Sequence, residues 1–437
     1  MRPWIKKTLK WTGIVLGVLA VLYAGIILYS FHAVNQALAR YHAQSFPTTY
    51  DELVHPTPDE DNAAVALQQL SDAIGKVPDF IEEVIKCLIP ENTDTASCRE
   101  YLAQHRAEID AWRENNANKL AMIDDVLARP KYRINYPEND PEIFFPALSN
   151  AKVGAIYYLT VLDYYHDVKR GDISAAISKI LRFCTLMHRY EDAAYNPANY
   201  LVAVVFRTKV LHDLGNIAQQ GNISKEQALA CLNYVKSIDL ASSYRRMLTG
   251  DLLLYSLYFG KILSVDSDPR WNELPSFTRY WKKSLMYSIG GSYFFHFNLS
   301  EANTLNSLLD LYDQAEKPTE ELVGIARRLD SQARIKSIFP IVPGDESRFS
   351  QIVFVGMVMH IARLNLIKTN LALALHKHIH GAYPPTLDAI DPAILTRVPQ
   401  DIFAEQPLAY AVSSNGTYTL SSPGLEAFQA RPTTQSP

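Results

Sequence analysis

Three histidines near the end of a long apolar segment have the spacing closest to that of a metal site. His376 and His380 stand four positions apart, which puts both imidazoles on one face of a helix, whereas His378 lies on another face. Two imidazoles at this spacing can hold Zn²⁺, but the glutamate that follows the first histidine in the H-E-x-x-H motif is absent. No third ligand is identifiable. We therefore predict no metal site, with His376 and His380 as the candidates should one exist.

Residues 188–192 form the second concentration of polar side chains, reading His-Arg-Tyr-Glu-Asp at the end of an expected helix. Cations suit the C-terminal end of a helix, where the macrodipole is negative, and this is sufficient reason for a histidine and an arginine to stand there. A hydrolytic site would require His188 and Glu191 to meet His360, or one of the later histidine pair, in a cleft. The sequence leaves that question to the tertiary structure.

Local catalytic motifs are absent. The sequence contains no G-x-S-x-G elbow, no P-loop, no dinucleotide fingerprint and no calcium-binding loop. Triads and paired carboxylates assemble in space from distant residues, so their absence from any short stretch does not exclude an enzyme. We predict no catalytic residue and no cofactor, and we leave open whether the protein is an enzyme.

Four cysteines are present, and two of them flank a turn-rich segment. Cys87 and Cys98 enclose the sequence IPENTDTAS, so we expect a disulfide that joins two helices at their junction. Cys184 and Cys231 lie on expected helices and are interpreted as buried thiols that act as small apolar residues. A C-x-x-C redox pair is absent.

The elements that must position these residues begin with an uncharged stretch that runs from Trp11 to Phe31. Twenty-one residues give roughly 31 Å of helix, close to the thickness of a bilayer's hydrocarbon core. Arg2 and three lysines precede the stretch, and the next acidic residue is Asp51. Because positively charged flanks stay cytoplasmic, we predict a single membrane span with its amino terminus inside and the bulk of the chain in the periplasm.

Two further interpretations of the amino terminus stay open. Ala37-Leu38-Ala39 has the form that signal peptidase accepts, so cleavage after Ala39 is the alternative to a retained anchor, although the apolar core is longer than a signal's. Gly13 and Gly17 form a G-x-x-x-G pair through which two anchors could pack closely.

The rest of the chain has the composition of a folded, mainly α-helical protein. It has 437 residues, of which 48% are apolar, and a formal charge of −4, which argues against nucleic acid as a partner. Capping patterns at Thr57, Asp79, Ser97 and Ser224 mark helix starts. The expected helices cover residues 59–74, 79–88, 97–128, 147–169, 172–191, 197–219, 224–239, 251–263, 300–316, 319–337 and 348–380.

Two glycine turns interrupt the middle of the chain. Gly171-Asp172 and Gly221-Asn222 stand fifty residues apart, each between a helix that ends and another that begins. This spacing predicts either a multi-helix bundle or a tetratricopeptide-like helical array. Further on, residues 285–299 carry no formal charge and hold several aromatic side chains. We interpret them as buried helix, with contact to the membrane surface as the alternative.

A small β-structured segment closes the chain. Strands are expected at 408–413 and 417–421, joined through Asn415-Gly416, a strong hairpin signal. This segment resembles the C-terminal module of type II secretion pseudopilins, in which a helix leads through Gly-x-Tyr-Pro to a small sheet. It is also similar to the tails of uncharacterised membrane-anchored bacterial proteins with a helical body. The matching residues are Gly381, Tyr383, Pro384, Leu387, Pro399, Asp401, Phe403, Pro407, Leu408, Tyr410, Tyr418, Ser421 and Gly424.

The chain departs from the pseudopilin pattern in two respects. Its anchor lacks the motif that a prepilin peptidase processes, so assembly into a pilus is not implied. The acidic loop that binds calcium in major pseudopilins is not evident beyond Asp401, and Ile402 stands where related tails often have proline. The expected divisions of the chain are a basic tail and anchor at 1–45, a helical region at 46–129, a Pro-rich connector at 130–146, a helical body at 147–360, the pseudopilin-like module at 361–424 and a tail at 425–437.

These observations predict a membrane-anchored protein of the cell envelope. The leading hypothesis is a non-catalytic component whose helical surface binds another envelope protein, since helical arrays offer extended concave surfaces. A membrane-tethered hydrolase is the first alternative, and a lipid-binding protein that uses residues 285–299 is the second.

Overall fold

A computed structural model describes residues 3–53, 57–75, 77–88, 96–133, 150–263, 292–338 and 347–430 of the chain. Most of the Pro-rich connector, residues 285–291 of the uncharged segment and the last seven residues lie outside the described part.

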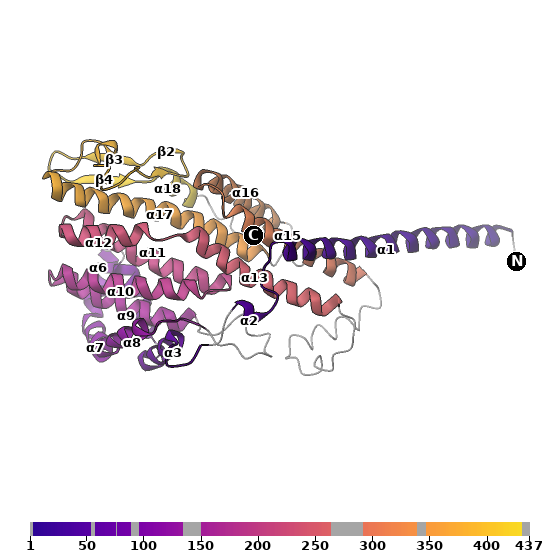
Figure 1. The fold of residues 1–437 in the computed structure, drawn as a ribbon, viewed down its shortest axis with the longest axis horizontal. Coiled ribbons are helices and arrows are strands. Elements are labelled where there is room, and N and C mark those ends of the chain that lie inside the picture. The colour runs from indigo at the N-terminus through magenta and orange to yellow at the C-terminus, as the bar shows by residue number, and fades with distance from the viewer. Residues whose placement is uncertain are drawn as a thin grey trace.

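The described chain is mainly α-helical, as the sequence predicts, with two small β-hairpins near the C-terminus. A single helix projects from one end of a long helical body (Figure 1). The helices in chain order are α1 (Pro3–Ala43), α2 (Tyr50–Leu53), α3 (Ala63–Ile74), α4 (Asp79–Leu88), α6 (Ala96–Gln104), α7 (Arg106–Ala117), α8 (Met122–Ala128), α9 (Asn150–Lys169), α10 (Ile173–Asp192), α11 (Pro197–Gln219), α12 (Lys225–Lys236), α13 (Leu240–Leu263), α15 (Ser292–Gln314), α16 (Thr319–Ile338), α17 (Ser347–His380) and α18 (Pro423–Gln429).

The two glycine turns end their helices as expected. Gly171 and Gly221 take the left-handed conformation, with φ of 78° and 76°, a conformation in which glycine avoids a steric penalty. Asp172 then caps α10 by accepting a hydrogen bond from the backbone of Ala175. Ser224 and Gln227 form a complete capping box at the start of α12. Helices α9 to α12 therefore begin and end close to where the sequence places them.

The long helix α17 runs through the body and organises its packing. It contacts α11 and α12 along one side and α13, α15 and α16 along another. The remaining layers follow below it in Figure 1, with α10 and α9 next and the amino-terminal α3 and α8 at the edge. Among the helices whose side chains are described along a membrane-spanning length, which leaves out α1, only α17 is long and apolar enough to cross a membrane. More than half of its most apolar 18-residue window is buried inside the fold. Its apolar side chains are accounted for by the core.

Two helix predictions in the amino-terminal region were wrong. The helix expected from residue 59 begins at Ala63, because Asn62 caps it by accepting the backbone N–H of Ala64. The same Asn62 side chain bonds both backbone groups of Arg133, and this long-range pairing overrides the local signal at Thr57. The helix expected at 97–128 is broken at His105, whose ring stacks on Phe80.

The same predicted helix is interrupted a second time at Asn118, where α7 ends and a short 3-10 turn (Asn118–Ala121) separates it from α8. Asparagine favours local side-chain hydrogen bonds over helix, and the amide of Asn116 donates to the carbonyl of Trp112.

The expected disulfide is present: Cys87 at the end of α4 is joined to Cys98 in α6, with their Cα atoms 5.1 Å apart.

The segment before α16 also differs from expectation. The helix predicted at 251–263 is the second half of the longer α13, and the uncharged segment is continuous with the helix predicted at 300–316. Both form one helix, α15, from residue 292 onward.

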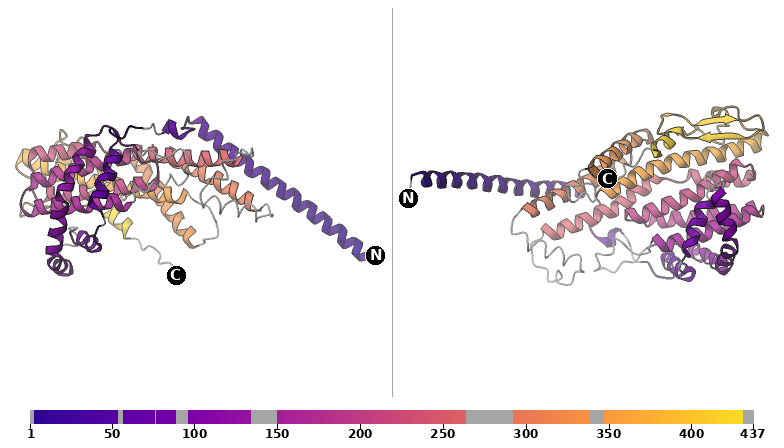
Figure 2. Two further views of the ribbon diagram at one scale, coloured as in Figure 1. Left: turned by 90° about the horizontal axis from the view of Figure 1, so that it is seen from below. Right: turned by 180° about the vertical axis from the view of Figure 1, so that it is seen from behind.

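The C-terminal module lies on α17 at the end of the body far from α1 (Figure 2). Strands β3 (Ala409–Val412) and β4 (Tyr418–Ser421) form the predicted antiparallel hairpin, with Ala409 opposite Ser421. Two elements were not predicted. One is a two-residue ladder between β1 (Gln400–Asp401) and β2 (Gln406–Pro407), and the other is helix α18.

Helix α1 extends well beyond the expected span and joins the body directly. Its last turns bury Val34, Ala37 and Tyr41, which recur at the spacing of one helix face. Arg40 forms ion pairs with Asp310 at 2.7 Å and Asp313 at 2.6 Å, both on α15. The helix is therefore packed into the body at one end and free of it at the other, as Figure 1 shows.

Candidate functional site

The two candidate metal ligands meet, and a carboxylate joins them. The rings of His376 and His380 lie 4.3 Å apart at the end of α17. His376 is buried, and its Nδ1 accepts the backbone N–H of Asp391 at 3.4 Å. The side chain of Asp391 lies 3.7 Å from Nε2 of His380. Among the described residues no group of three or more histidine, cysteine, aspartate or glutamate side chains is arranged to hold a metal ion.

The surroundings of the three histidines at the end of α17 favour packing and hydrogen bonding over metal binding. Burial lowers the pKa of His376, and the neighbouring His380 lowers it further, so His376 is neutral near pH 7. His378 faces elsewhere and lies 2.6 Å from the carbonyl oxygen of Ile223, to which its ring N–H donates. The three histidines thus attach the end of α17 to the adjacent loops.

The polar run at the end of α10 enters a buried ionic cluster. Glu191 pairs with Arg207 of α11 at 2.5 Å, and the two side chains are 0% and 1% exposed. Arg207 also lies 3.2 Å from Nδ1 of His188, to which its guanidinium donates. Nearer the surface, Asp192 pairs with Arg246 of α13 and lies 3.7 Å from Nε2 of His188.

Burial sets the protonation of this cluster. It raises the pKa of Glu191, and the positive charge of Arg207 opposes that rise. Burial also lowers the pKa of His188. On α17, burial together with Arg363 and Arg207 lowers the pKa of His360 to about 3, so this imidazole is neutral. No hydrogen-bond partner for its Nδ1 is present within the described chain.

The structure places the residues that a hydrolytic site would need. His188 and Glu191 both contact Arg207, and His360 on α17 contributes no hydrogen bond to that group within the described chain, while Glu191 and Arg207 are closed off from solvent. His376 stands sixteen residues further along α17, roughly 24 Å away at helical rise. A substrate would have to displace core helices to reach the Glu191–Arg207 pair, whereas His188 and Asp192 are 45% and 41% exposed at the outer edge of the cluster. Its evident effect is to fix α10 against α11, as expected when a buried charge is neutralised by a partner.

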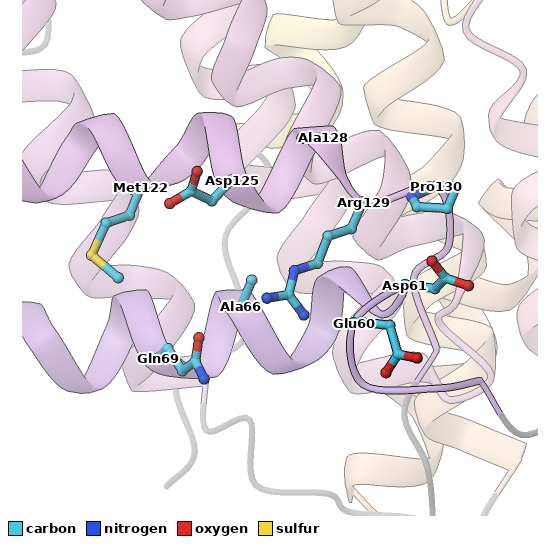
Figure 3. Close-up of a pocket in the computed structure, with 9 residues that line it drawn as sticks. All are labelled: Glu60, Asp61, Ala66, Gln69, Met122, Asp125, Ala128, Arg129 and Pro130. Atoms are coloured by element: carbon cyan, nitrogen blue, oxygen red, sulfur yellow. The ribbon is translucent and has the colours of Figure 1, made fainter.

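A described depression lies elsewhere, between α3 and α8. It encloses about 440 Å³. Figure 3 shows Glu60 and Asp61 beside Arg129, with Asp125 further along α8. The lining residues are Glu60, Asp61, Ala66, Gln69, Met122, Asp125, Ala128, Arg129 and Pro130.

This depression has the composition of an open polar surface. Its lining contains no histidine, serine, threonine, cysteine, lysine or tyrosine, so it offers no such nucleophile or base. The guanidinium of Arg129 is already bonded to the backbone carbonyls of Asp59 and Asn62. Arg129 therefore holds the loop that precedes α3 in place.

Sequence inspection missed the residue that organises the buried cluster. Arg207 and Lys209 interrupt the apolar run AVVFRTKVL, and a charged residue within a core helix is a signal for a buried partner. It also missed Asp391, which no local pattern connects to the histidines.

No protein-family model, curated protein or solved structure matches this chain.

Proposed function

We propose that the protein is a membrane-anchored, extracytoplasmic component of the cell envelope that binds another envelope protein and has no catalytic activity. The observation that carries the proposal is the two-part character of α1. Between Trp11 and Tyr29 its described side chains are apolar and exposed, with Val21 at 73% and Leu28 at 70%, whereas its last turns are packed on α15. Exposed apolar surface on this scale is costly in water and favourable in lipid.

The disulfide supports an oxidising compartment for the body. A bond between Cys87 and Cys98 is maintained outside the cytoplasm and reduced inside it. The four positive charges before the span support the same orientation, with the amino terminus inside.

The packing of α1 supports a retained anchor. Cleavage after Ala39 would cut between Ala37 and Tyr41, both fully buried, within a continuous helix. Cleavage there would also remove Val34 and Ala37, which are buried in the core of the body.

The absence of catalytic activity is inferred from the groups that come together. The buried Glu191–Arg207 pair neutralises its own charges, and the lining of the open depression contains no histidine, serine, cysteine or lysine. The pseudopilin-like module extends the proposal toward assembly with other envelope proteins. In this module Asp401 accepts the backbone N–H groups of Phe403, Ala404 and Gly424, so its carboxylate already serves as the local cap.

A topology measurement tests the placement. Alkaline phosphatase fused at the C-terminus should be active, and a fluorescent protein that folds only in the cytoplasm should be dark. Carbonate washing should leave the full chain in the membrane. A phosphatase fusion that is inactive, or a mature protein recovered in the soluble fraction, would overturn the proposal.

A crosslinking pull-down from intact membranes tests the partner. We expect one or more specific envelope proteins to be recovered with the full chain and lost when the body is deleted but the anchor is kept. Recovery that depends on the anchor alone would contradict binding by the body.

A further inference from the structure

Helix α15 lies beside α1 and runs in the same direction. Both helices begin on the side that points away from the body and run back toward it, as the two views in Figure 2 show. The contact between them is extensive. Beyond its first turns, α15 buries Ala302, Leu305 and Leu309 within the body. The two helices therefore form a parallel pair.

Polar contacts fix which residues of the pair stand at the same level. Arg40 bonds Asp310 at 2.7 Å, and Gln44 bonds Asp313 at 3.3 Å. In these two pairs the residue of α15 comes 270 and 269 positions after its partner in α1. Because both helices rise about 1.5 Å per residue, the same offset places Glu301 level with Phe31, and the start of α15 level with Leu22.

That level coincides with a change in the composition of α15. Residues 292–300 read SYFFHFNLS, with no formal charge and four aromatic rings, and Glu301 is the first charged residue of the helix. On α1 the expected span ends at Phe31, and the next charged residue is Arg40. The uncharged turns of α15 therefore stand beside the outer half of the uncharged Trp11–Phe31 stretch of α1.

We propose that the first turns of α15, residues 292–300, insert into the acyl-chain region of the outer leaflet beside the anchor. The inference rests on the proposed membrane anchor and adds a second contact between the body and lipid. These turns reach roughly 14 Å below the level of Phe31, about the thickness of one leaflet's hydrocarbon layer. Charged side chains would oppose such insertion, and the aromatic residues suit the interface.

Depth-resolved fluorescence on the full chain in phospholipid vesicles tests this placement. A cysteine for labelling with an environment-sensitive fluorophore is introduced singly by Phe295→Cys, Leu28→Cys or Glu320→Cys. The Leu28 position reports the anchor, and Glu320, exposed at the start of α16, reports the aqueous body. Burial raises the pKa of the Cys231 thiol to about 12 and that of Cys184 also, so neither native thiol competes for the label.

The inference expects the label at position 295 to lose fluorescence to a nitroxide carried on the acyl chains, as the label at position 28 does. It also expects protection from iodide, whereas the label at position 320 is quenched by iodide alone. Phe297→Cys repeats the measurement should the first variant fail to fold.

The outcomes separate the two proposals. Acyl-chain quenching at position 28 with iodide quenching at positions 295 and 297 overturns the insertion of α15 and leaves the anchor in place. Iodide quenching at position 28 overturns the anchor, and the inference is lost with it.

Discussion

Removing the guanidinium of Arg207 should destabilise the body severely. Arg207→Ala leaves Glu191 buried without its partner, since the two side chains are 1% and 0% exposed and 2.5 Å apart. The carboxylate must then be buried as an unpaired charge or take up a proton. Either outcome lowers the free energy of unfolding.

The expected size follows from burial. Breaking a buried ion pair by removing one partner costs about 3–5 kcal/mol, because the remaining charge is left uncompensated. Arg246→Ala provides a matched control in the same region. Arg246 pairs with Asp192, but these side chains are 39% and 41% exposed, and exposed pairs contribute about 0–1 kcal/mol. The first variant should therefore lose several times more stability than the second.

Urea unfolding of the full chain in detergent, followed by circular dichroism, measures the difference. The loss in Arg207→Ala should increase as pH rises above the ordinary range of a glutamate. Burial raises the pKa of Glu191, so folding disfavours its ionised form. Without Arg207 nothing offsets this penalty, and the penalty grows as the pH rises and the carboxyl group ionises in the unfolded chain. The double variant Arg207→Met with Glu191→Leu should recover most of the stability, because it buries no charge. Equal losses in Arg207→Ala and Arg246→Ala would refute this reasoning.

Three further predictions concern single positions. The pKa of His360 falls from 6.5 to about 3 on folding. The free energy of unfolding should therefore decrease by roughly 5 kcal/mol as the pH falls from 6.5 toward 3. In denaturant titrations over this pH range, His360→Leu should show a smaller decrease. Gly424→Ala should lower the stability by about 1–3 kcal/mol, because the new Cβ would lie 2.8 Å from the carboxylate of Asp401. Gly324→Ala is the control in the same thermal melts. Its Cβ would meet no neighbouring atom closer than 4.0 Å, so it should be neutral or stabilising. Cys98→Ser should lower stability by about 2–3 kcal/mol, as should reduction of the wild-type disulfide, and an unchanged melting temperature in both would show that the bond contributes nothing.

Much of the helical architecture could be predicted because its signals are local. The capping box of Ser224 and Gln227 and the left-handed glycines at 171 and 221 satisfy backbone groups within a few residues of themselves. Neighbours in sequence supply everything these motifs need, and the helices at 173–192, 197–219 and 319–338 accordingly agree with expectation.

Local signals failed where a distant segment competed for the same backbone. Asn62 caps α3 because residues 131–133 return to bond with it, and His105 breaks a helix where it meets Phe80. Neither partner is visible in a window of one or two turns.

By itself the sequence determined the uncharged span, the helical class, the pairing of Cys87 with Cys98 and the C-terminal hairpin, since each depends on composition or on residues close together in the chain. Only the tertiary structure decided that Glu191 and His188 both meet Arg207, with the Glu191–Arg207 pair closed to solvent, and that the start of α15 stands level with the uncharged stretch of α1. Those outcomes depend on how helices far apart in sequence pack together. Such packing is a property of the whole set of core contacts and leaves no pattern within any one segment.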